Sequence, residues 1–203
     1  EVSGRLASGF GEAKETTTRA PKTAEEQMNT KKGKKLIEAA IKRFSQATKL
    51  VDASYHEKAL PFFKEARANI KKAGGKLSKD YGRVCHDLAN NYLVLKDTKR
   101  AERLFNEARE SFGQSVGNKD PLYAACLRNI ARIRLEAEDL GEYEALMKEA
   151  MSIYGINLED NHLEYRATLR SLIGLYRKTR QTELENALVM EDKMIEKMQG
   201  RLR

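Results

Sequence analysis

The sequence predicts an all-α fold in which pairs of helices stack side by side into an α-solenoid. Its composition is the first reason. Three prolines, no tryptophan and abundant Ala, Leu, Glu, Lys and Arg favour helices over strands. The second reason is a helical pattern of small and large residues that returns every 42 residues along most of the chain. A fixed period of this length is typical of stacked supersecondary units.

The pattern is clearest in the stretch AERLFNEARESFG, which contains Ala101, Phe105 and Ala108. The same places are filled 42 residues earlier by Ala59, Phe63 and Ala66, and 42 residues later by Tyr143, Met147 and Ala150. Small residues let helix backbones approach closely, and the large residues between them fill the wider gaps. We therefore expect all three triplets to be buried between helices.

Other positions share the period and divide the chain into units. Tyr81, Tyr123 and Tyr165 are in register, and so are Leu88, Ile130 and Leu172. The units span about 35–77, 78–119, 120–161 and 162–203, and each is expected to hold two helices. In the second unit these helices run over about 80–96 and 99–112, with a tight turn at Asp97 and Thr98 between them.

Helix ends are predicted from capping residues. Asp120 followed by Pro121 is a favourable helix start, because Asp accepts free first-turn amides and Pro is tolerated at the first helical position. Gly113 and Gly155 stand where the second helices of two units should end. A chain leaving a helix often needs a left-handed residue there, so both glycines are predicted to supply one.

The last helix departs from the pattern. Glu185, Val189 and Asp192 occupy its triplet places, and two of them are charged. Because a terminal repeat has no following neighbour, this predicts a polar outer face that caps the array. Met190, Met194 and Met198 lie at helical spacing on the same helix and are expected in the core. An adaptable contact surface for another subunit is the alternative.

Residues 1–34 form a predicted extended tail. They show no apolar periodicity and are rich in Gly, Thr, Lys and Glu, so they bury too little apolar surface to fold alone. Scattered anchors such as Val2, Leu6, Phe10 and Met28 suggest that the tail is ordered on a partner or on the body. The start at Glu1 rather than Met fits a processed precursor, and we expect an organelle, a plastid slightly more than a mitochondrion, after transit-peptide removal.

Charge and cysteine content limit the function classes. The net charge of +8 is compatible with acidic protein segments or nucleic acid, but acidic residues are interspersed throughout, so protein partners are favoured. The longest apolar runs are a few residues, which excludes a transmembrane segment. Cys85 and Cys126 lack metal-ligand spacing and fall on apolar helix faces, which predicts buried free thiols and a reducing intracellular compartment.

The second unit resembles the tetratricopeptide (TPR) repeat family. In the stretch LANNYLVLKDTKRAERLFNEA, the family's Leu, small and aromatic places hold Leu88, Ala89 and Tyr92, and its small-aromatic-small places hold Ala101, Phe105 and Ala108. The period of 42, longer than the usual 34, resembles the kinesin-light-chain type of TPR. This resemblance covers about residues 38–200 and implies a right-handed superhelix of three to four helix pairs, whose first helices line a concave protein-binding groove.

The resemblance also suggests partner-binding residues on the first helices. Asn129 matches a place where an Asn often grips the partner's backbone, while Asp87 and Ser171 stand there in the neighbouring units. The complete set of predicted partner-binding residues is Arg83, His86, Asn90, Arg128, Asn129, Arg132, Arg170 and Arg177. The arginines would form a ladder suited to carboxylates of an acidic or extended segment. His86, Asn90 and Asn129 resemble part of a chaperone-binding carboxylate clamp whose lysines are missing here.

No pattern in the sequence indicates catalysis. His56, His86 and His162 lie far from any nucleophile or phosphate-loop motif, so we expect neither an enzyme nor a cofactor, metal site or small-molecule substrate. The predicted function is a protein-protein interaction scaffold, an adaptor or a structural subunit of a larger, organellar complex. Two alternatives remain: a peripheral RNA-associated protein of an organellar ribosome, and a TPR regulator that tethers a metabolic enzyme.

Overall fold

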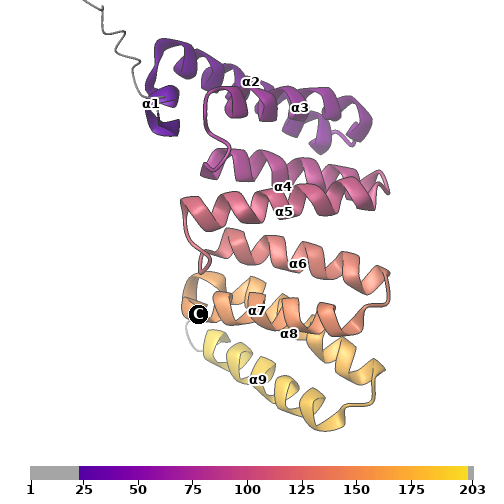
Figure 1. Ribbon diagram of the computed structural model, residues 1–203. Coiled ribbons are helices and arrows are strands. Elements are labelled where there is room, and N and C mark those ends of the chain that lie inside the picture. The colour runs from indigo at the N-terminus through magenta and orange to yellow at the C-terminus, as the bar shows by residue number, and fades with distance from the viewer. Residues whose placement is uncertain (1–22, 201–203) are drawn as a thin grey trace, which may run out of the picture.

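The computed structural model describes residues 23–200, and all regular structure in this range is helical. The helices are α1 (Ala24–Asn29), α2 (Lys31–Asp52), α3 (His56–Lys72), α4 (Lys79–Val94), α5 (Thr98–Ser115), α6 (Pro121–Glu136), α7 (Leu140–Ile156), α8 (Leu158–Lys178) and α9 (Thr182–Gly200). From α2 to α8, each helix packs on the one before it and on the one after it, and α9 packs on α8. Figure 1 shows these helices stacked in chain order, with short turns alternating between the two edges. The predicted α-solenoid is confirmed.

Short side chains set the start of several helices. Ser78 caps α4 by accepting the Tyr81 amide at 3.2 Å, and Asp97 caps α5 by accepting the Arg100 amide at 3.1 Å. As predicted, α6 begins at Pro121 after Asp120, whose side chain accepts the Leu122 amide at 2.8 Å. These bonds satisfy amides that a helix leaves without an internal partner.

The tight turn between the two helices of each pair has the same backbone in all four pairs. Its left-handed residues are Ser54, Lys96, Glu138 and Arg180, with φ between 58° and 64°. Successive members of this set are 42 residues apart, so the period of the sequence is also a period of the backbone.

The repeated triplets lie in the core, as expected. Ala59, Phe63 and Ala66 are almost fully buried in α3, and so are Ala101, Phe105 and Ala108 in α5. Tyr143, Met147 and Ala150 fill the same places in α7. The resulting core runs along the array between successive helices, which leaves polar side chains of the first helices free to face outward.

The predicted role of two glycines is wrong. Gly113 and Gly155 lie inside α5 and α7, which continue to Ser115 and Ile156, and neither has a positive φ. Their actual neighbours are tyrosines of the following helix: a Cβ on Gly113 would lie 3.5 Å from the Tyr123 ring, and one on Gly155 would lie 3.2 Å from the Tyr165 ring. Gly155 therefore leaves space for the Tyr165 ring, whereas a Cβ at Gly113 would make an ordinary contact with the Tyr123 ring.

Part of the stretch predicted as an extended tail lies within the described residues and is helical. Residues 23–34 are largely helical, because Thr23 caps α1 with a capping box and Thr30 caps α2 by accepting the Gly33 amide at 2.9 Å. Met28 of α1 lies next to Gly75 in the α3–α4 loop, so this part packs on the body of the chain. Residues 1–22, with the anchors Val2, Leu6 and Phe10, lie outside the described residues.

The last helix differs from both predictions made for it. Glu185 and Asp192 face α8 rather than an outer surface, and they form ion pairs with arginines of that helix. Charge pairing replaces the small-aromatic-small packing of the earlier pairs, so the predicted polar outer face is not formed by these residues. Met190, Met194 and Met198 are 61–66% exposed, which contradicts a core role and agrees with the alternative of a contact surface.

Candidate protein-binding groove

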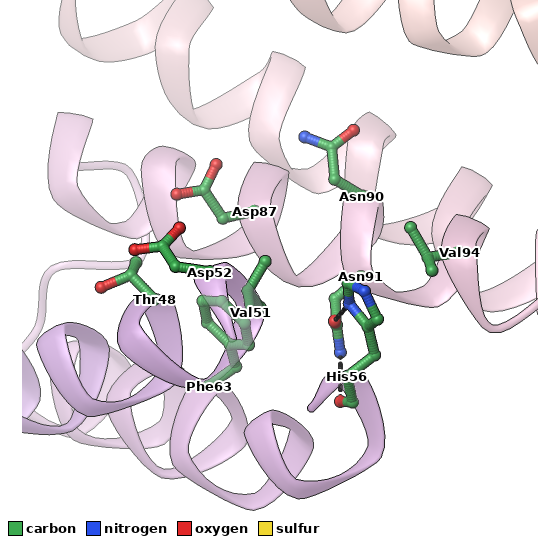
Figure 2. Close-up of a pocket in the computed structure, with 9 residues that line it drawn as sticks. All are labelled: Thr48, Val51, Asp52, His56, Phe63, Asp87, Asn90, Asn91 and Val94. Carbon is green, nitrogen blue, oxygen red and sulfur yellow. Dashed lines mark hydrogen bonds between the residues drawn. The ribbon is translucent and has the colours of Figure 1, made fainter. Parts of the chain in front are cut away.

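A cleft of about 270 Å³ separates the first helices of the first two pairs. Helices α2 and α4 form its walls, and the start and middle of α3 contribute His56 and Phe63 beneath them (Figure 2). The lining residues are Thr48, Val51, Asp52, His56, Phe63, Asp87, Asn90, Asn91 and Val94. A second hollow lies nearer the start of α2 and α4, where Ile41 and Arg83 contribute to the lining. The two hollows mark one groove along α2 and α4.

A buried asparagine fixes one end of this groove. Asn91 is 2% exposed, and its Nδ2 donates to the backbone oxygen of His56 at 2.8 Å. Its Oδ1 lies 2.8 Å from His56 Nδ1, so the imidazole donates from Nδ1 and the amide is satisfied at both ends. These bonds, visible in Figure 2, join the start of α3 to the end of α4. Sequence reasoning missed this pair, because the two residues are separated by a helix and share no motif.

Three of the predicted partner-binding residues meet at the next junction. Asn129 Nδ2 of α6 lies 3.0 Å from His86 Nε2 of α4, and Asn90 Nδ2 lies 3.3 Å from His86 Nδ1. His86 Nδ1 also lies 3.1 Å from Asp87 Oδ1, and its ring packs edge-on against Phe105. An imidazole that donates from Nδ1 to Asp87 and accepts at Nε2 from Asn129 satisfies two of these contacts, and the Asn90 amide then cannot donate to the same Nδ1. The network leaves Asn129 one amide hydrogen and its oxygen for a partner.

The predicted arginine ladder is divided among three environments. Arg83 and Arg132 are exposed and form no ion pair within residues 23–200. Arg128 lies over the Tyr154 ring, with its Cζ 5.9 Å from the ring centroid. Arg170 pairs with Asp192 at 2.9 Å and Arg177 pairs with Glu185 at 2.8 Å, so both are engaged by α9. Arg132 follows Asn129 by three residues in the sequence. Of the arginines that remain free to bind a partner, it is therefore the nearest to Asn129 along the chain.

These helices carry the tetratricopeptide pattern in sequence as well as in geometry. Residues 85–155, from α4 to the end of α7, match the family model of the tetratricopeptide repeat. In sequence, residues 85–155 are therefore similar to tetratricopeptide repeats. No curated protein matches the sequence.

Solved TPR-like structures share the fold at low sequence identity. The crystal structure of BtubC (BKLC) from P. vanneervenii is 18% identical, with a TM-score of 0.76 over 87% of this chain and 70% of that chain. Two structures of nearly identical TPR-like repeats, from a Podosopora anserina protein assigned as a kinesin light chain, are each 16% identical. Their TM-scores are 0.65 and 0.64, over 80% of this chain and 76% and 77% of those chains. The expected likeness to kinesin-light-chain repeats is confirmed at the level of fold.

The TPR fold suggests a protein-binding scaffold. The structure also gives information on the reactivity of the two cysteines, on metal binding and on membrane-spanning helices. Burial raises the pKa of the Cys85 thiol to about 11 and that of Cys126 to about 12, which keeps both thiols protonated and weakly nucleophilic. Residues 23–200 contain no group of three or more His, Cys, Asp or Glu side chains placed to hold a metal ion. Within the same range, no helix is both long and apolar enough to cross a membrane.

Proposed function

We propose that this chain binds an extended segment of a protein partner along α2, α4 and α6 and acts as a scaffold or structural subunit of a larger complex. The observation that carries the proposal is the polar network of His86, Asn90 and Asn129, with exposed Arg132 on the same helix as Asn129. The His86, Asn90 and Asn129 side chains are partly exposed and Arg132 is exposed, and these groups retain unused hydrogen-bonding capacity. Amides and guanidinium groups of this kind suit backbone carbonyls and carboxylates of an extended chain.

The aromatic residues favour protein over RNA as the partner. Binding of single-stranded RNA needs exposed rings on which bases stack. Tyr81, Tyr92, Tyr143, Tyr154 and Tyr176 are all buried in the core, and Tyr55 is the most exposed aromatic side chain in the part of the chain that is described. The RNA-associated role and the tethering of a metabolic enzyme have no observation in their favour. An organellar location stays a prediction, which cell fractionation would test.

The proposal is tested in two steps. Cross-linking mass spectrometry of the native complex identifies the partner and shows whether its cross-links fall on α2, α4 and α6. Titration calorimetry then compares the wild type with Arg132→Glu and with Asn129→Ala. We expect each variant to weaken binding by about tenfold or more, because each removes a charged or amide contact to the partner.

The matched control reverses a charge away from the proposed surface. Lys64 is exposed on α3, so Lys64→Glu changes the net charge as much as Arg132→Glu does. We expect this control to bind normally. Unchanged affinity of both groove variants, with cross-links confined to other helices, would reject the groove as the binding surface.

A further inference from the structure

The cleft between α2 and α4 presents two carboxylates, one histidine and no Lys or Arg. Asp52 comes from the end of α2 and Asp87 from the middle of α4, and Figure 2 shows both at the same side of the cleft beside Thr48. No Lys or Arg lines this cleft. Within residues 23–200, Asp52 forms no ion pair, and the only ion-pair contact of Asp87 is with the His86 ring. The cleft therefore has an uncompensated negative charge in a protein whose net charge is +8.

Packing does not require these two carboxylates. At the places 42 residues further along, Asp52 is replaced by Val94 and Asp87 by Asn129, and 84 residues along by Glu136 and Ser171. By contrast, the buried triplets of the same repeats keep side chains of similar size at nearly every equivalent position. The positions of Asp52 and Asp87 hold apolar, polar or acidic residues in different repeats, although the fold is the same. The repeat fold therefore does not require a carboxylate at either position. Among these equivalent places in the described helices, two carboxylates occur together only at the α2–α4 junction.

The other surfaces of the cleft suit the apolar stem of a long basic side chain. Val51, Phe63 and Val94 provide apolar surface next to the carboxylates. Lys and Arg side chains commonly lay their methylene groups on such a surface and keep the charged head among polar groups. At about 270 Å³ the cleft is slightly smaller than sites for drug-sized ligands, so its size fits one long side chain.

We infer that this cleft binds an arginine or lysine side chain of the partner's extended segment. The inference rests on the proposed function and adds the chemistry of the partner. A cation between Asp52 and Asp87 relieves the repulsion of two neighbouring carboxylates and gains charge-assisted hydrogen bonds. Because Arg132 lies two helices further along the groove, the partner would place its basic residue at α2 and α4 and an acidic or carbonyl group near α6.

The experiment selects binding peptides from a random dodecapeptide library displayed on phage. The baits are the purified wild type and the double variant Asp52→Asn and Asp87→Asn, which keeps side-chain size and removes both charges. We expect the wild type to enrich peptides with Lys or Arg at one fixed position. The best of these peptides should bind the double variant about tenfold more weakly. The same peptide with citrulline or norleucine at that position should lose a similar factor on the wild type.

The control removes one carboxylate from a corresponding place in another repeat. Glu136 is exposed and stands 84 residues after Asp52, so Glu136→Gln should bind the selected peptide as the wild type does. Circular dichroism checks that all variants remain helical. If the selected peptides have no basic position, or bind the double variant equally well, the inference is wrong while groove binding stands. If no peptide is selected by the wild type, neither the inference nor the proposed groove survives.

Discussion

Arg166 of α8 donates a hydrogen bond from Nε to Oδ1 of Asp192 on α9, at 2.6 Å. Oδ2 of the same carboxylate accepts from Arg170 Nε at 2.9 Å, so one aspartate ties two arginines of the preceding helix. Both side chains of the Arg166–Asp192 pair are largely buried, with 14% and 17% of their surface exposed. The last helix is thus attached by a shared ion pair at the place where earlier pairs use Ala66, Ala108 and Ala150.

Removal of the Asp192 carboxylate should therefore loosen α9. We expect Asp192→Ala to lower the free energy of unfolding by about 2 kcal/mol, because it leaves the Arg166 guanidinium largely buried without its main acceptor. Urea denaturation followed by circular dichroism measures this change. Glu196→Gln is the control, since Glu196 is 67% exposed and 3.7 Å from Arg166, and surface pairs of this kind contribute at most about 1 kcal/mol. Equal effects of the two variants would contradict a special role for Asp192.

Acid should destabilise the array through Glu107. Burial opposes ionisation of this carboxyl, but hydrogen bonds from Arg67 and from the Tyr81 hydroxyl outweigh it and hold the pKa of Glu107 below its usual 4.5. A carboxyl whose pKa is lower in the folded chain contributes stability that is complete above the unfolded pKa and is lost as pH falls through the folded one. We expect Glu107→Gln to be less stable than the wild type at pH 7, with the difference shrinking below about pH 4.5.

Urea denaturation at a series of pH values between neutral and strongly acidic measures this dependence. Glu110→Gln is the matched control, because Glu110 is an exposed carboxyl on the same helix and has no ion pair in residues 23–200. Its stability should run parallel to that of the wild type. A Glu107→Gln curve parallel to the wild type at all pH values would show that the Arg67 pair does not carry the linkage.

Cysteine labelling should report unfolding rather than surface access. The chain has two cysteines, and burial raises the pKa of Cys85 to about 11 and of Cys126 to about 12. At pH 8 neither thiol ionises in the folded state, so we expect Ellman's reagent to react with both only as fast as the protein opens. The labelling rate should rise in parallel with the unfolded fraction as urea is added. Prompt reaction of one thiol in the absence of urea would place that cysteine in a mobile or open segment.

Buried positions could be predicted from the sequence wherever the 42-residue period determines how the helices pack. The offset of 42 located the buried triplets of α3, α5 and α7 because small and large residues must alternate wherever helices approach closely. The family resemblance grouped His86, Asn90 and Asn129, and the structure brings these side chains together, while their role in partner binding stays a prediction. The buried triplets depend on one helix face and one period, whereas His86 and Asn129 are 43 residues apart on two different helices.

Contacts between positions outside the period could not be predicted. Asp192 stands in an Ala place, and its arginine partners on α8 become visible only when the helices are assembled. Asp52 and Asp87 are 35 residues apart and line one cleft because α2 and α4 form its two walls. The left-handed turn residues Ser54, Lys96, Glu138 and Arg180 also escape prediction, since none of them is the glycine that normally marks a positive φ.

Glycine substitutions should separate junctions that have room for a methyl group from those that do not. Gly113 lies inside α5, where a Cβ would meet the Tyr123 ring at an ordinary 3.5 Å. Ala favours a helix over Gly by up to about 1 kcal/mol, so we expect Gly113→Ala to stabilise the protein by about 0.5 kcal/mol near the end of the helix. Gly82 lies inside α4, but a Cβ there would be 2.6 Å from the Phe112 ring.

That close approach should reverse the sign of the effect. The Phe112 ring is almost fully buried and has little space to move, so Gly82→Ala forces overpacking that costs about 1–3 kcal/mol despite the better helix propensity. Thermal unfolding of Gly113→Ala, Gly82→Ala and the wild type measures whether each substitution raises or lowers the stability of the protein. In a Phe112→Leu background, Gly82→Ala should destabilise the protein less than it does in the wild type, because the smaller leucine side chain removes the clash. Destabilisation by Gly82→Ala that is the same in both backgrounds would show that ring contact is not its cause.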